Sequence, residues 1–143
     1  MIKKSRLVGG AIATALAAAI LVPASQASAD SSCNSGYHCG WDIGFNTGKV
    51  AFFNSDPDFR NDRFNTGVIV DNNIKSAKNR TSTNYVSVYY YGVNYTEDIV
   101  FCVNPGSDVE NLPDDGVPGN GIGEANEASS LRLIAGGPFS TCY

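Results

Sequence analysis

Short apolar runs separated by turn residues dominate the chain after residue 30. Four runs, at 50–53, 68–70, 85–91 and 99–103, are rich in β-branched and aromatic residues and are bounded by Gly, Asn, Asp or Pro. Within the third run, Tyr-Val-Ser-Val-Tyr alternates as on a half-buried strand. Apart from one short helical turn expected near 59–64, this region has no helical period. The spacing predicts an all-β sandwich or barrel.

An internal repeat divides this region into two similar units offset by about 50 residues. Residues 41–46 (WDIGFN) align with 91–96 (YGVNYT), and 74–77 (IKSA) has a counterpart in 129–131 (SSL). Each unit contains an aromatic residue, a tight Gly/Asn turn, a second aromatic residue, a strand, a long loop and a Ser-containing strand. Two copies predict a pseudo-symmetric sandwich. Asp98 falls on Gly48, so either the second turn is built differently or the alignment slips there.

One segment, residues 104–127, breaks this rhythm. It contains five glycines, three prolines, six acidic residues and no basic residue. Such a composition is incompatible with a regular strand, and a structureless stretch of this length is usually functional or disordered. We expect disorder at least at its centre.

Residues 1–29 have the three parts of a secretory signal peptide. Lys3, Lys4 and Arg6 precede an apolar run at 9–22, and Ala27-Ser28-Ala29 fits a cleavage site. The run is about 14 residues long, shorter than the roughly 20 that a membrane-spanning helix needs. We therefore expect a signal peptide of bacterial type, a domain of residues 30–143, and a secreted, extracellular product.

Charge argues against two classes of partner. Cleavage after Ala29 removes three of the ten basic residues and none of the 14 acidic residues, which leaves a net charge of −7. A negative surface repels phosphate backbones and anionic lipids. We expect no nucleic acid and no membrane as partner of the mature protein, which is expected to be a monomer without a cofactor.

Four cysteines, Cys33, Cys39, Cys102 and Cys142, remain after cleavage. An even number in a small exported chain predicts two disulfides. Three connectivities are possible. We favour Cys33–Cys39, which is local, together with Cys102–Cys142, which ties the C-terminal region to the body. The alternative is a zinc site completed by His38, but the C-x-x-C spacing of structural zinc sites is absent. No metal site is expected.

The stretch Tyr37-x-Cys39-x-Trp41-Asp42-x-Gly44-Phe45-x-x-Gly48 resembles the first motif of βγ-crystallin-type domains. The resemblance implies an aromatic hairpin that folds over, a glycine in a conformation that other residues resist, and Ser76 closing the fold by hydrogen bonds. The signal peptide, N-terminal cysteine pair, two such motifs and late Ser-Ser-Leu strand resemble the streptomycete metalloproteinase-inhibitor family over most of 33–133. The implied fold is two Greek-key-like units in a βγ-crystallin-like sandwich.

The resemblance also implies a secreted inhibitor of a thermolysin-like zinc metalloprotease, acting through a rigid substrate-like segment. Inhibition in this family is associated with a Cys-Val bond, and this chain has Cys102-Val103 followed by Asn104-Pro105-Gly106. Thermolysin-like enzymes prefer a hydrophobic residue after the scissile bond, which Val103 would supply. A disulfide at Cys102 would lower the entropy lost on binding. In the alternative, Cys102 and Val103 are the buried end of a strand with a structural disulfide.

Another class of function stays open: a non-inhibitory βγ-crystallin-type binding or toxin-like secreted module, including one that binds calcium. Calcium-binding domains of this fold use two Asn/Asp residues, two variable residues, then Ser/Thr and Ser. Residues 71–76 place Lys75 at a ligand position, and residues 125–130 begin with Ala125. Calcium wants six to eight oxygen ligands, so each loop is degraded at one position.

Enzymatic activity is not expected. His38 is the only histidine of the chain and lies beside the predicted disulfide at Cys39. The sequence contains no G-x-S-x-G stretch and no phosphate-binding loop.

Overall fold

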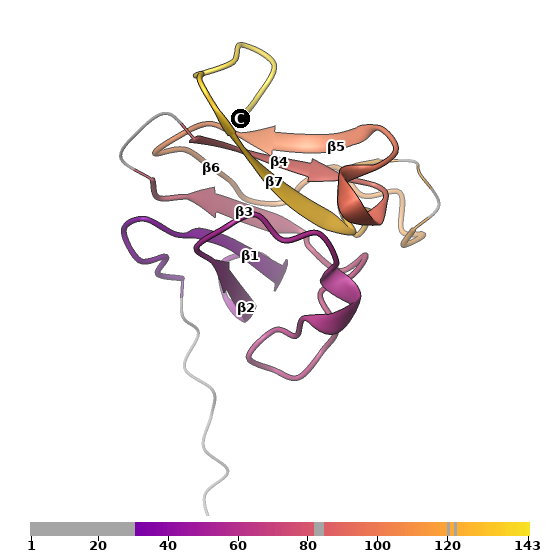
Figure 1. The fold of residues 1–143 in the computed structure, drawn as a ribbon. Coiled ribbons are helices and arrows are strands. Elements are labelled where there is room, and N and C mark those ends of the chain that lie inside the picture. The colour runs from indigo at the N-terminus through magenta and orange to yellow at the C-terminus, as the bar shows by residue number, and fades with distance from the viewer. Residues whose placement is uncertain (1–30, 82–84, 120, 122) are drawn as a thin grey trace, which may run out of the picture.

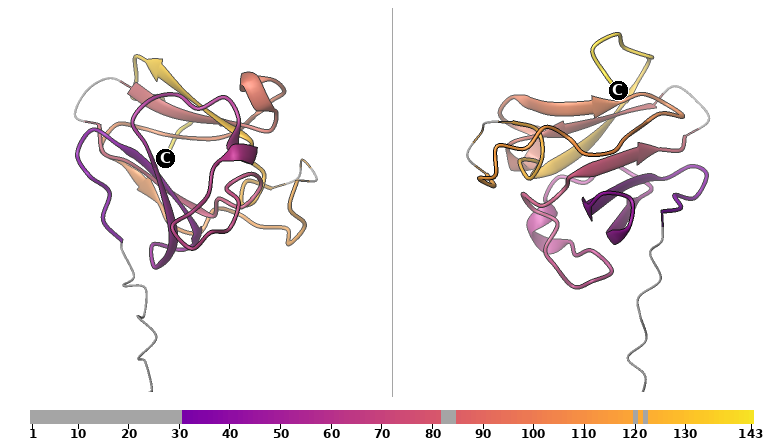
Figure 2. Two further views of the ribbon diagram at one scale, coloured as in Figure 1. Left: turned by 60° about the horizontal axis from the view of Figure 1, so that its bottom comes forward. Right: turned by 180° about the vertical axis from the view of Figure 1, so that it is seen from behind.

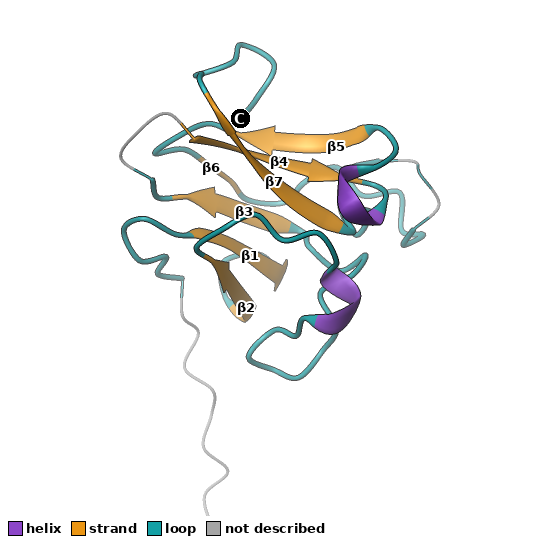
Figure 3. Cartoon of the chain, viewed as in Figure 1, coloured by secondary structure: helices purple, strands orange, loops and turns teal. Residues whose placement is uncertain are grey.

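The computed structural model describes residues 31–81, 85–119, 121 and 123–143, so the predicted signal peptide at 1–29 lies outside the described residues. The described chain forms two antiparallel sheets and two short 3-10 helices (Figures 1 and 3). No helix in this part of the chain has the length and apolarity to cross a membrane. In chain order the elements are β1 (His38–Ile43), β2 (Thr47–Phe52), η1 (Phe59–Asn61), β3 (Ser76–Asn79), β4 (Tyr85–Tyr90), η2 (Val93–Tyr95), β5 (Ile99–Val103), β6 (Asp108–Val109) and β7 (Ser130–Ala135).

The two predicted units are built alike. In the first sheet, ordered β2-β1-β3-β6, Trp41 of β1 lies opposite Ser76 of β3. In the second, ordered β5-β4-β7, Tyr90 of β4 lies opposite Ser130 of β7. Trp41 therefore corresponds to Tyr90, and the sequence alignment that set it on Tyr91 was off by one residue. The β4–β5 ladder shifts its register between Tyr89 and Tyr90, which the sequence pattern does not reveal.

The glycine and serine positions of the motif have clear structural roles. Gly48 has φ +61°, and a Cβ there would lie 2.3 Å from the carboxyl group of Asp42, so only glycine fits. The Ser130 hydroxyl donates to the Gly92 carbonyl oxygen (2.7 Å) and accepts from the Tyr95 N–H (3.2 Å), which holds the second folded hairpin. The Ser76 hydroxyl accepts from the Asn111 N–H (3.3 Å), across the two units.

Each unit also gives one segment to the sheet of the other. Strand β6, from the second unit, pairs with β3 of the first, with Ala77 opposite Val109 (Figure 2). In return, Asp56 of the first unit exchanges two backbone hydrogen bonds of 2.8 Å with Leu131 of β7. Neither sheet is complete without the other unit, so the two repeats form one sandwich.

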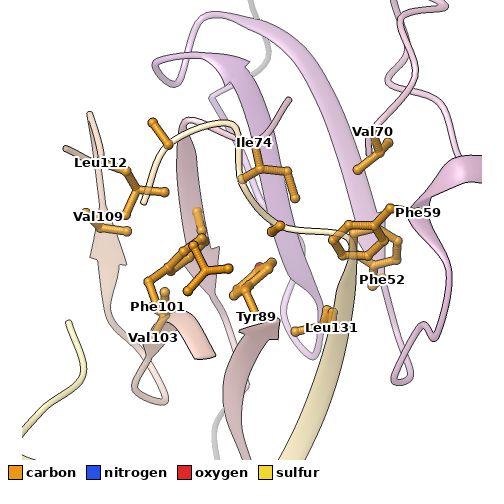
Figure 4. Close-up of a cluster of buried hydrophobic side chains, with 14 of the residues drawn as sticks. Phe52, Phe59, Val70, Ile74, Tyr89, Phe101, Val103, Val109, Leu112 and Leu131 are labelled. Carbon is orange, nitrogen blue, oxygen red and sulfur yellow. The ribbon is translucent and has the colours of Figure 1, made fainter. Parts of the chain in front are cut away.

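The main core lies between the sheets (Figure 4). Aromatic rings dominate it: Tyr89 stacks on Phe101 with ring centroids 4.2 Å apart, and Phe52 stacks on Phe59 at 5.1 Å. Burying a side chain of this size contributes about 2–3 kcal/mol. The remaining buried members are Phe64, Val70, Ile74, Ala77, Val100, Val103, Val109, Leu112, Ala125, Ala128 and Leu131.

A second, smaller cluster covers the outer face of the second sheet. Val86, Val88 and Tyr90 are buried there, and Tyr95, Cys102, Ile134 and Cys142 pack against them. Strand β4 is therefore buried on both faces beyond its first residue, and the expectation of a half-buried strand was wrong. The C-terminal segment after β7 returns to this face, which the local alternation of side chains cannot show.

Two further expectations change. Residues 68–70 form no strand, although Val70 is fully buried in the core and Ile69 makes one isolated bridge to Arg63. The acidic segment 104–127 contains β6 and buries Leu112 and Ala125 against the main core. Its two flanks are thus packed against the sandwich, whereas residues 113–119 at its centre are exposed and Asn120 and Ile122 lie outside the described residues. The expected disorder of the centre stays a prediction. A few apolar side chains hold the segment despite its glycine and proline content. The short helical turn predicted near 59–64 is confirmed as η1.

Candidate functional site

The predicted reactive bond lies at the end of β5, at the edge of the second sheet. Val103 is 0% exposed and packs in the main core beside Phe101 (Figure 4). Its backbone carbonyl accepts a hydrogen bond from the side-chain amide of Asn79, at 3.0 Å. In this geometry the Val103 side chain points into the protein and is not presented to a protease.

The carbonyl oxygen of the predicted reactive bond, that of Cys102, also accepts a hydrogen bond. The Tyr143 N–H donates to the Cys102 carbonyl oxygen (3.0 Å), and the Asn104 N–H donates to the Tyr143 carbonyl oxygen (2.8 Å). The C-terminal residue therefore covers this end of the β5 edge. A protease can reach the carbonyl between Cys102 and Val103 only after Tyr143 has moved away. The assignment of this bond as the reactive bond stays a prediction.

The favoured disulfide pairing is confirmed: Cys33 is bonded to Cys39, and Cys102 is bonded to Cys142. Loop-closure entropy assigns about 2 kcal/mol of stability to the short loop and about 4 kcal/mol to the long one. The second disulfide joins β5 to the C-terminal segment, so it anchors that segment beside the predicted reactive bond.

Asn104 links the end of β5 to the C-terminal segment. The sequence pattern indicated only that Asn104 is part of an Asn-Pro-Gly turn. Its side-chain amide donates to the carbonyl oxygens of Phe139 (3.0 Å) and Cys142 (3.2 Å). Its side-chain oxygen accepts from the Phe139 N–H (2.8 Å). Asn104 is 35 residues from Phe139 in the sequence, and no local pattern links the two.

A groove of about 540 Å³ runs beside this region, between β5 and the C-terminal segment. It is lined by residues 99–102 of β5, residues 140–143 of the C-terminal segment, and Glu124. The Tyr143 hydroxyl donates to the Glu124 carboxylate at 2.5 Å, which links the C-terminal segment to the acidic stretch. The edge of β5, the disulfide and the C-terminal segment thus form one continuous surface.

His38 lies in a different place, at a cavity of about 560 Å³ near Phe53 and Tyr85. Its Nδ1 contacts the hydroxyl of Ser87, and both residues are fully buried. Burial lowers the pKa of His38 to about 4, so the ring is neutral at physiological pH. Among the described residues no carboxylate bonds the His38 ring to orient it in the way that a catalytic triad requires. Across the described residues no group of three or more His, Cys, Asp or Glu is placed to hold a metal ion.

The two predicted calcium loops pack against each other. The Asn72 N–H donates to the Ala128 carbonyl, and the Asn126 N–H donates to the Ile74 carbonyl. The ammonium group of Lys75, expected to repel a cation, lies 3.4 Å from the carboxylate of Asp114.

A polar pocket of about 320 Å³ lies at these loops, lined by Asn72, Tyr91, Glu97, Gly119, Gly121 and Glu127. Glu127 is only 1% exposed. One of its carboxylate oxygens accepts from the Gly121 N–H at 2.8 Å, and the other is buried without a partner among the described residues. The calcium pattern of the sequence did not single out this side chain, because it stands at a variable position.

Comparisons with known proteins agree with this architecture. The sequence profile of peptidase inhibitor family I36 matches residues 26–103. A solved structure described as "Evolution of the eye lens beta-gamma-crystallin domain fold" is similar, with a TM-score of 0.52 and 14% identity over 71% of this chain and 87% of that chain. At this level of identity the likeness shows the fold alone. A search of curated proteins found no match to this chain.

The fold and the family agree with the resemblance stated from the motifs. Two disulfides and the inhibitor family indicate an extracellular protein with a protease as partner, and not an enzyme. Because the family profile covers more than half of the sequence, this βγ-crystallin-like chain belongs to peptidase inhibitor family I36.

Proposed function

We propose that this protein is a secreted, monomeric inhibitor of a zinc metalloprotease of the thermolysin type. Protease inhibition follows from the family. The observation that carries the proposal is the disulfide between Cys102 and Cys142, which closes the C-terminal segment onto the edge of β5. A segment held in this way loses little entropy on binding. Export through the predicted signal peptide would bring the protein to secreted proteases.

Rigid attachment also explains how such a segment resists being consumed. A zinc protease polarises the scissile carbonyl and activates a water molecule. If a bond between Cys102 and Cys142 is cut, the disulfide keeps the new ends joined, so resealing competes with release. The predicted reactive bond, Cys102–Val103, lies inside this closed loop and is the first bond to check.

The test is a titration of thermolysin with the protein purified from the culture medium, in oxidised and in reduced form. We expect stoichiometric inhibition by the oxidised protein and its loss on reduction. Mass spectrometry after long incubation then locates any cut. A secreted serine protease serves as the control for class. Inhibition of the serine protease without inhibition of thermolysin would contradict the proposed target class, and inhibition of neither would contradict the proposal altogether.

Glu127 favours calcium binding as a second candidate function. A buried carboxylate oxygen without a partner is costly unless a cation or proton balances it. Asn72 and Glu97 line the same polar pocket and offer further oxygen atoms of the kind that calcium prefers. We expect calcium to raise the melting temperature of the protein and Glu127→Gln to abolish this shift. Equal shifts in both proteins would exclude this pocket as the calcium site.

A further inference from the structure

The C-terminal loop, residues 136–141, stands out from the second sheet beyond the end of β7 (Figure 1). All of its residues are exposed. Gly136 and Gly137 open it with φ of +115° and +94°, values that L side chains rarely adopt. A Cβ on Gly137 would lie 2.6 Å from the Val86 side chain, so glycine lets the loop press onto the sheet. The start of the loop is therefore closely packed on the sandwich.

The middle of the loop is fixed by Asn104. The Asn104 side chain bonds both backbone groups of Phe139: it accepts from the N–H at 2.8 Å and donates to the carbonyl at 3.0 Å. The same amide donates to the Cys142 carbonyl at 3.2 Å, and the disulfide from Cys142 to Cys102 holds the end of the loop. The backbone of Phe139 is thus fixed by two hydrogen bonds from Asn104 and by the disulfide three residues further on.

Phe139 is nevertheless 41% exposed. Single exposed apolar residues are common and carry no message by themselves. Phe139 combines an exposed aromatic side chain with a backbone that the Asn104 side-chain amide and the nearby Cys102–Cys142 disulfide hold in place. Such a residue loses little conformational entropy when a partner buries it, which is the property of an aromatic anchor in an interface.

We propose that this C-terminal loop is the protease-contacting segment, with Phe139 as the side chain that enters an apolar pocket of the protease and Asn104 as its positioning residue. The inference rests on the proposed function. A thermolysin-like enzyme prefers a hydrophobic residue after the scissile bond, and Phe139 offers one in the open, whereas the side chain of Val103 is buried in the core.

The experiment compares inhibition constants against thermolysin for the full secreted protein and two single variants. Phe139→Ala removes the proposed anchor. Ile43→Ala is the matched control, because Ile43 is 61% exposed and belongs to β1. We expect Phe139→Ala to raise the inhibition constant by about 30-fold or more, as for an interface hot spot. Ile43→Ala should change it less than about 3-fold, and both melting temperatures should stay near that of the unmodified protein.

The outcomes separate the two claims. Inhibition by the unmodified protein with an unchanged constant for Phe139→Ala would overturn the loop assignment and leave the inhibitor proposal in place. Absence of inhibition by the unmodified protein would overturn both.

The positioning role of Asn104 is tested by a double-mutant cycle. Asn104→Ala removes two hydrogen bonds to Phe139 and one to Cys142. It should weaken inhibition by about 10-fold, because Phe139 then has to be ordered on binding. In the Phe139→Ala background the same change should have little further effect, since the two residues act through one contact. Additive effects of the two substitutions would show that Asn104 acts elsewhere and would overturn its assignment.

Discussion

Tyr143 donates its backbone N–H to the Cys102 carbonyl oxygen at 3.0 Å, so the last residue of the chain closes one end of the outer edge of β5. An open edge strand is a template for pairing with other chains, and covering it suppresses such contacts. The same contact shields the carbonyl of the bond predicted to be reactive. Stability of the sheet edge and access to that bond are therefore linked.

Val103→Ala distinguishes a core residue from a reactive one. Because Val103 is buried in the main core, we expect the substitution to lower the free energy of unfolding by about 2 kcal/mol through lost burial and a small cavity. Inhibition measured well below the melting temperature should change little. Urea denaturation and a thermolysin titration on the same preparation check both. A large loss of inhibition with full stability would support Cys102–Val103 as the reactive bond instead.

The two disulfides should separate stability from inhibition. Replacing Cys102 and Cys142 by Ala should cost about 4 kcal/mol of stability and release the C-terminal loop, so inhibition should fall sharply. The matched pair Cys33→Ala and Cys39→Ala should cost about 2 kcal/mol and leave the loop closed. Denaturant unfolding and inhibition assays report the two effects. Equal losses of inhibition from both pairs would argue against a special role of the C-terminal closure.

Acid should destabilise the protein through His38. Burial lowers its pKa to about 4, against about 6.5 in an unfolded chain. Between these two pH values the unfolded state binds more protons than the folded state. The free energy of unfolding is therefore highest, as far as His38 is concerned, above about pH 6.5, and it falls as the pH drops toward 4. The shift corresponds to about 3 kcal/mol at most. Denaturation curves at pH 4.5 and pH 7 should differ more for the unmodified protein than for His38→Gln.

Asp62 changes the stability in the opposite direction over an overlapping pH range. Burial, followed by the charge of Asp56, raises the pKa of Asp62 to about 6. Between about pH 4 and pH 6 the folded state keeps a proton on Asp62 that the unfolded state releases. The stabilisation that this proton gives to the folded state is therefore lost as the pH rises from about 4 to 6. Asp62→Asn removes it and is the control for the His38 experiment. If His38→Gln has the same pH dependence as the unmodified protein, then His38 does not control acid stability.

Tyr89→Phe should be neutral or stabilising. The Tyr89 hydroxyl is buried without a hydrogen-bond partner among the described residues, and burial raises its pKa. Removing it relieves a desolvation cost of about 1 kcal/mol while the stack on Phe101 remains. Tyr89→Leu, which loses the stack, should destabilise by about 2 kcal/mol. Thermal unfolding checks both, and a marked destabilisation by Tyr89→Phe would reveal a partner for the hydroxyl, such as a buried water.

Local patterns succeeded where one short segment carries all the information. The run at 99–103 became β5 with the predicted bounds, and the aromatic motif at 37–48 led to the βγ-crystallin-like fold. They failed where a distant segment supplies the partner. The run at 68–70 has strand-forming residues but no neighbouring strand to pair with, apart from the single bridge at Ile69. The segment 104–127 was expected to contain no regular strand, yet it contains β6, because the pairing partner of β6 is the distant strand β3.

The sequence by itself determined the all-β class, the two repeated units, the number of disulfides and the inhibitor family, because periodicity, turn residues, cysteine count and motif spacing are properties of neighbouring residues. Only the tertiary structure decided that Val103 faces the core and that Phe139 is exposed on a fixed loop. The first depends on the pairing of β5 with β4 and the packing of the two sheets. The second depends on contacts between segments about 40 residues apart, namely the disulfide from Cys102 to Cys142 and the hydrogen bonds from Asn104 to Phe139. Such contacts form only when the whole sandwich is assembled.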